Sequence, residues 1–156
     1  MKSTITTRQE WAERGAAVVA AFLAEAEAAG PTLTSGDRAT LGRAAVEAYP
    51  LDSLTDALTF ALADIYHHAS DLRAPHDLLG AALMELSTTP NMVPVLIALG
   101  DDGRPGVVVC TIAAILAYGD HHGVCVHEVT DRAYDHWADE VEEERFMRVR
   151  AERHAQ

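Results

Sequence analysis

The sequence predicts a mainly α protein, a single-domain bundle of five or six helices, on three observations. Its 156 residues fit one domain, which can bury enough surface to fold without a disulfide or a metal ion. Hydrophobic residues make up 49% of the chain and charged residues 23%, which is typical of globular domains. Between the Gly- and Pro-containing breaks, apolar residues recur at intervals of three and four, which indicates helices with one buried face.

The first two helices are delimited by start and stop signals. Thr7-Arg8-Gln9-Glu10 fits a capping box, and Gly30-Pro31 cannot continue a helix, so the first helix is predicted at about 7–29. A second helix is predicted to begin at Thr34 or Ser35 and to end before Pro50.

Three further helices follow. The third is predicted from Asp52 or Ser53 to about Ala69, and it is apolar over so much of its circumference that we expect it to be central. The fourth is predicted to begin at Pro75, because proline suits the first turn of a helix. The last is predicted from about His127 to about Arg153.

The segment 93–112 is compatible with two structures. A helix over 106–118 would place Ile112 and Ile115 on one face. Alternatively, strands over 93–99 and 106–112 would form a β-hairpin around the turn-forming residues 100–105. The prediction favours a helix for 106–118 and leaves 93–99 undecided.

The apolar stripes of these helices predict the core. Ten large side chains are expected in it: Trp11, Phe22, Leu58, Leu62, Ile65, Leu79, Leu83, Ile112, Ile115 and Trp137.

Charge restricts the classes of partner. The 24 acidic residues outnumber the 12 basic ones, so direct binding to nucleic acid, which needs clustered cations, is not expected. Lys2 is the only lysine among many arginines, which is typical of proteins from GC-rich bacterial genomes. Residues 1–10 lack the apolar core of a secretory signal, and no apolar run is long enough to span a membrane. With Cys110 and Cys125 expected to be free thiols, the expected location is the cytoplasm.

Two groups of His and Asp residues carry the main enzymatic hypothesis. Asp64, His67, His68 and Asp71 share one polar helical face, and His121 and His122 follow a later apolar run. Together they would suit a transition metal in a metal-dependent hydrolase. However, di-metal bundles use Glu-x-x-His motifs on facing helices, and no such pair is present in the sequence. We therefore expect no metal or other cofactor.

No nucleophile or phosphate-binding motif appears either. The chain has no GxSxG elbow, and a phosphate loop would need a lysine that the sequence lacks. Whether the protein is an enzyme stays open, with a binding protein preferred.

The residues of the predicted C-terminal helix suggest the preferred function. The chain is divided into a helical domain, 1–144, and a basic helical tail, 145–156, which contains four arginines and one glutamate. We predict an acidic regulatory or accessory protein that binds a macromolecular partner, a basic protein or a second copy, through the last helix. A nucleic-acid mimic acting on a DNA-binding protein is a further alternative. The predicted partner-binding residues are Glu140, Glu143, Phe146, Met147 and Val149.

Overall fold

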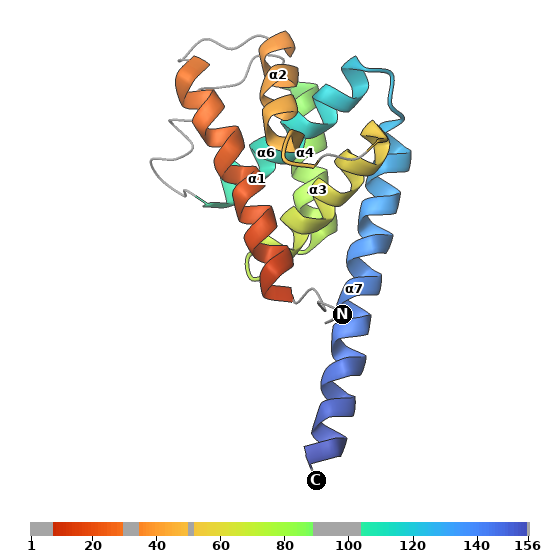
Figure 1. Cartoon of the computed structure of the whole chain (residues 1–156). Coiled ribbons are helices and arrows are strands. Elements are labelled where there is room, and N and C mark those ends of the chain that lie inside the picture. The colour runs from red at the N-terminus through yellow and green to blue at the C-terminus, as the bar shows by residue number, and fades with distance from the viewer. Residues whose placement is uncertain (1–7, 30–34, 50–51, 89–103, 156) are drawn as a thin grey trace.

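The computed structural model describes residues 8–29, 35–49, 52–88 and 104–155, and these form six helices and no strand. The helices are α1 (Arg8–Ala29), α2 (Ser35–Val46), α3 (Leu54–His68), α4 (Pro75–Thr88), α6 (Arg104–His121) and α7 (Val126–Ala155). Figure 1 shows five of them gathered into a body, with α7 along one side and its C-terminal half extending beyond the body. The prediction of a mainly α bundle of five or six helices is confirmed.

The β-hairpin considered for 93–112 is wrong where the structure describes it. Residues 104–112 are helical within α6, and residues 93–99 lie outside the described residues. The valines at 107 and 108 are buried in the core, and Thr111 donates a hydrogen bond to the backbone oxygen of Val107 at 2.8 Å. Packing against neighbouring helices has overridden the local β-propensity of this valine-rich segment.

The third helix, α3, is at the centre of the body, as its apolar circumference predicted. It packs against α1, α7, α6 and α2, and ten of its 15 residues are buried. Its N-terminus is capped by Ser53, whose side-chain oxygen accepts a hydrogen bond from the backbone N–H of Asp56 at 3.3 Å.

Two glycines let helix pairs approach closely. A Cβ at Gly15 of α1 would lie 2.1 Å from the backbone oxygen of Asp64 in α3, and one at Gly42 of α2 would lie 2.0 Å from that of Ala114 in α6. Both separations are far below van der Waals contact, so only glycine allows the two pairs to pack at these distances. The first contact fixes α1 against the segment of α3 that carries Asp64 and His67.

The core agrees with most of the predicted set. Leu79 and Trp137 are half-buried against the core, whereas Leu83 is 42% exposed, so its placement in the core is wrong. Leu78 and Ala82, one position earlier along α4, are the residues that face inward. The other seven are buried: Trp11, Phe22, Leu58, Leu62, Ile65, Ile112 and Ile115.

The last helix has two parts that differ in their surroundings. Its first part packs on α3 through Val129 and Ala133, with Trp137 half-buried beside them. From residue 141 to 155, which we call the α7 extension, every side chain is exposed or half-exposed. The helix runs through residues 144 and 145 without a break, so the predicted tail continues the helix of the body. None of the described helices is both long and apolar enough to cross a membrane.

Candidate functional site

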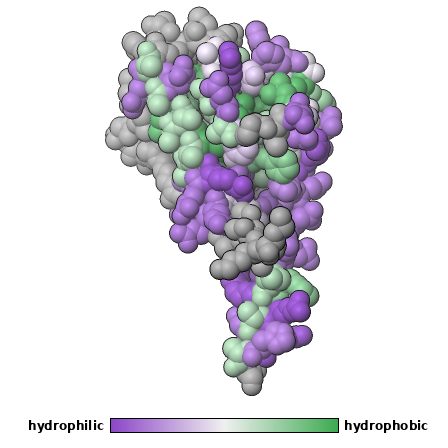
Figure 2. All heavy atoms as spheres, viewed as in Figure 1, coloured by the Kyte–Doolittle hydropathy of each residue, from purple (hydrophilic) through white to green (hydrophobic). Residues whose placement is uncertain are grey.

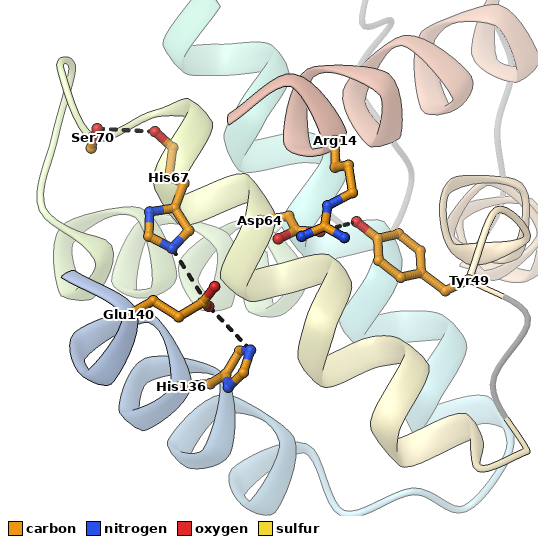
Figure 3. Close-up of polar contacts among 7 residues, drawn as sticks. All are labelled: Arg14, Tyr49, Asp64, His67, Ser70, His136 and Glu140. Carbon is orange, nitrogen blue, oxygen red and sulfur yellow. Dashed lines mark hydrogen bonds and ion pairs between the residues drawn. The ribbon is translucent and has the colours of Figure 1, made fainter. Parts of the chain in front are cut away.

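Asp64, on α3, lies in a buried polar contact with α1 and with the end of the α2 segment. It is 5% exposed and accepts a hydrogen bond from the hydroxyl of Tyr49. The Arg14 Nε atom lies 3.5 Å from Asp64 Oδ2, and the rest of this side chain reaches solvent. Figure 3 shows both groups directed at the same carboxylate.

Burial governs the protonation of this contact. It raises the pKa of Asp64, while the hydrogen bond from Tyr49 and the charge of Arg14 act in the opposite direction. Burial also raises the pKa of Tyr49, and its hydrogen bond to Asp64 adds to the increase. Tyr49 therefore keeps its proton at neutral pH and serves as a hydrogen-bond donor.

His67, one turn further along α3, lies between two tryptophans. It is 2% exposed and stacks on Trp11 with ring centroids 4.7 Å apart and ring planes 25° apart. The ring of Trp137 lies 6.4 Å away on the α7 side. His67 therefore contacts side chains from α1 and α7.

Glu140 of α7 meets His67 at this position. Its Oε1 atom lies 3.6 Å from Nε2 of His67 and 3.1 Å from Nε2 of His136, as Figure 3 shows. These distances are within ion-pair range, but Glu140 Oε1 has no hydrogen bond of good geometry, nor have the ring nitrogens of His67. The two histidines therefore lie beside one carboxylate between α3 and α7.

This arrangement favours a structural role for the polar contacts. Asp64 ties α3 to Arg14 of α1 and to Tyr49, whereas His67 contacts Glu140 of α7. Among the described residues, no group of three or more His, Cys, Asp or Glu side chains could hold a metal ion. From the buried face of α3, Asp64 thus contacts α1, and His67 contacts both α1 and α7.

The six residues of the metal hypothesis are not brought together. Asp64 and His67 are buried, His68 is half-buried, and Asp71 is exposed. His121 and His122 are exposed at the end of α6, where the His122 ring contacts Tyr118. Figure 1 places the end of α3 and the end of α6 at opposite ends of the body.

The predicted partner-binding residues are divided by the structure. Glu140 was expected on a solvated face, but it is only 8% exposed, because it lies one heptad beyond Ala133 on the side of α7 that packs against α3. Glu143 is exposed. Phe146, Met147 and Val149 are 65%, 40% and 41% exposed, respectively.

The exposed apolar residues lie within a charged extension. Glu142 and Glu143 precede them, and four arginines, at positions 145, 148, 150 and 153, follow or alternate with them. Figure 2 shows apolar surface between hydrophilic side chains over this extension. The structure therefore leaves an amphipathic helical surface accessible outside the body.

Sequence reasoning missed several members of the polar contacts. Tyr49 follows α2 outside any helical stripe, and Arg14 lies on a half-exposed turn of α1, so neither carried a signal. Glu140 did carry one, because it continues the heptad spacing of Val126 and Ala133.

The comparisons with known proteins identified no relative of this chain. No family model, curated protein or solved structure matches the chain.

Proposed function

We propose that this protein is a regulatory or accessory protein that binds a protein partner, and that the α7 extension is its docking surface. The observation that supports this best is the exposure of Phe146, Met147 and Val149 on a helix that projects beyond the body. Apolar residues gathered on an accessible surface are typical of interaction sites.

The packing of the first part of α7 explains how the extension can be helical without packing on the body. Nucleation is the costly step of helix formation, and an isolated helix of about 12–15 residues is marginal in water. Here the preceding turns of α7 are held against the body by Val129, Ala133 and the half-buried Trp137, so each further turn only propagates a formed helix. Arg153 and His154 in the last turn also favour the helix dipole.

Partner binding would remove apolar surface from water. Full burial of a side chain the size of Phe or Val contributes about 1.5–3 kcal/mol. Phe146, at 65% exposed, has more than half of that contribution still to gain. Acidic residues before it and arginines after it would set the orientation of the partner.

The charge of the chain favours a protein over a nucleic acid as the partner. The formal net charge is −12, and the extension carries four glutamates, at positions 142, 143, 144 and 152, together with its four arginines. We place the protein in the cytoplasm, since Cys110 and Cys125 are both free thiols.

A comparison of matched baits tests this function. The double variant Phe146→Glu/Val149→Glu removes the apolar surface, and Leu83→Glu introduces the same change at a 42% exposed position on α4. Each of the three proteins is used to capture binding proteins from the native host. We then identify and purify the proteins that bind wild type and Leu83→Glu but do not bind the double variant. Their affinity is then measured by calorimetry.

The expected result is that a purified partner binds wild type and the Leu83→Glu control alike and loses at least about tenfold in affinity for the double variant. Equal binding of every captured partner to all three proteins would refute docking through the α7 extension.

A further inference from the structure

We propose that the partner of the α7 extension is a second copy of this chain, bound with the two helices antiparallel. This inference rests on the proposed function, because it names the occupant of the same surface. It is supported by an internal symmetry of the exposed face of the extension. The charges before the apolar centre are opposite to those after it.

The face in question has the spacing of a coiled-coil seam. Glu142, Phe146, Val149 and Arg153 are separated by four, three and four residues, the pattern of successive a and d positions. We call these four residues the α7 seam. Each of them is exposed. The seam is therefore a continuous strip over residues 142–153 that the body does not cover.

Helix geometry directs the seam away from the body. At about 100° per residue, Phe146 and Val149 lie about 120° and 180° round the helix from Glu140, which is buried against α3. Met147, in contrast, lies within about 20° of Glu140 and continues the side that faces the body. A helix docked on the seam would therefore approach from the outer side of α7.

The seam is complementary to itself only when the second helix runs in the opposite direction. In the antiparallel arrangement Phe146 of each copy lies against Val149 of the other, and Glu142 of each copy then lies against Arg153 of the other. The centre is apolar and both ends carry opposite charges. A parallel pair in register would instead place each Glu142 against Glu142 and each Arg153 against Arg153.

The residues beside the seam follow the same rule. In an antiparallel pair, residues that flank the seam on one side contact residues that flank it on the same side of the other helix. Glu143 of one copy therefore lies near Arg150 of the other, and Arg145 of one copy lies near Glu152 of the other. Both pairs are oppositely charged, and each occurs twice because of the two-fold axis. Charge therefore selects orientation and register, while Phe146 and Val149 provide apolar contact.

The arrangement closes as a dimer. Each copy presents the same surface to the other, so the contact is isologous and does not propagate. The body of each copy packs on the preceding turns of its own α7, on the side opposite the seam. In an antiparallel pair the two bodies therefore lie at opposite ends and leave the seam accessible.

The small contact predicts a weak dimer. Residues 142–153 span only about 18 Å of helix. Four apolar side chains, two from each copy, form the centre. Such a contact belongs to the class of small, transient interfaces, and we expect dissociation in the micromolar range or weaker, with further weakening at high salt.

Sedimentation equilibrium of the full chain from about 10 µM to about 1 mM tests the pairing. Wild type is expected to shift from monomer toward dimer mass over this range. Phe146→Glu is expected to remain monomeric, whereas Met147→Glu, a change of the same kind on the side of α7 away from the seam, is expected to retain the dimer. A wild type that stays monomeric, a wild type that forms larger species without a limit, or equal losses in both variants would overturn the proposal.

Charge reversal provides a second, independent test. Glu142→Arg/Glu143→Arg makes the four paired positions 142, 143, 150 and 153 all basic, and Arg150→Glu/Arg153→Glu makes the same four positions all acidic. Each variant alone is expected to be monomeric, and an equimolar mixture is expected to restore the dimer. Dimers of either variant alone, or a mixture that stays monomeric, would contradict the antiparallel seam. Circular dichroism confirms that each variant retains its helix content.

Cross-linking fixes the orientation. In a Cys125→Ser background, chains with Glu142→Cys are mixed with chains with Arg153→Cys and oxidised. A disulfide in the mixture, and none in either variant alone, supports the antiparallel register, and the reverse pattern overturns it.

These results are distinguishable from those that decide the proposed function. A wild type that is monomeric up to about 1 mM but binds a purified foreign protein through Phe146 and Val149 would refute self-pairing and retain the docking function. A monomer that also binds no protein through this surface would refute both.

Discussion

Truncation of Leu62 to alanine tests the central position of α3. Leu62 is 0% exposed, and α3 packs against four other helices. Leu83→Ala is the matched control, because it removes the same atoms from a side chain that is 42% exposed on α4.

The two substitutions differ in what they remove. At Leu62 the loss includes the transfer free energy of a fully buried side chain and the cost of the cavity left in the core, together about 2–5 kcal/mol of unfolding free energy. At Leu83 much of the side chain is already in water, and no closed cavity forms in the described surroundings, so the expected loss is below about 1 kcal/mol. For a domain of this size, the larger loss corresponds to a decrease in melting temperature of about 5–20 °C.

Urea denaturation followed by circular dichroism at 222 nm measures both free energies, and calorimetry gives the melting temperatures. A similar slope of free energy against urea for each variant shows that the comparison concerns stability alone. If the two losses differed by less than about 1 kcal/mol, the central position of α3 would be wrong.

Three further predictions concern close packing, protonation and thiol reactivity. Gly42→Ala is expected to destabilise the fold by more than about 2 kcal/mol in urea denaturation. Gly80→Ala is the control, because a Cβ there meets nothing within 4 Å, and it is expected to stabilise the fold by about 0.5–1 kcal/mol. Equal effects of the two substitutions would refute the close contact at Gly42. Burial raises the pKa of Asp64 above its usual 3.8, so its contribution to stability is present below that pH and is lost as the pH rises. The difference in unfolding free energy between Asp64→Asn and wild type is therefore expected to move in favour of the variant as the pH rises from about 4, and a change of the opposite sign in urea titrations would refute this. Burial raises the pKa of Cys110 to about 11 while Cys125 is exposed, so a thiol reagent at neutral pH is expected to modify one cysteine in the folded protein and two after unfolding. Rapid modification of both in the folded protein would contradict the burial of Cys110.

The helices could be predicted because their signals are local. The third helix was predicted to begin at Asp52 or Ser53, and Ser53 is its N-cap, while Pro75 is the first residue of α4, as predicted. The first part of α6 was ambiguous because valines favour strands locally, and only burial against other helices decides the outcome. Leu83 was misplaced for a similar reason, since Ala82 and Leu83 both fit the apolar stripe and the neighbours of α4 select Ala82 as the residue that faces inward.

The candidate site was less predictable because it depends on pairs of helices. Asp64 and His67 stood together as metal ligands, since residues three apart share a helical face. In the structure this face is divided. Asp64 meets Tyr49 and Arg14, whereas His67 meets Glu140 of α7. Sequence periodicity shows that a helical face is polar, but it does not show whether water or buried partners lie opposite.

The function inferred for α7 depends on the same distinction. From the sequence alone, Phe146, Met147 and Val149 form one group of apolar residues among charges. The burial of Glu140 against α3 separates them, because it defines which side of α7 faces the body. Met147 then continues that side, while Phe146 and Val149 lie on the outer side with Glu142 and Arg153 at either end. The antiparallel symmetry of the seam follows only after this division, so the buried carboxylate of Glu140 is the observation that connects the anchored part of α7 to its proposed interface.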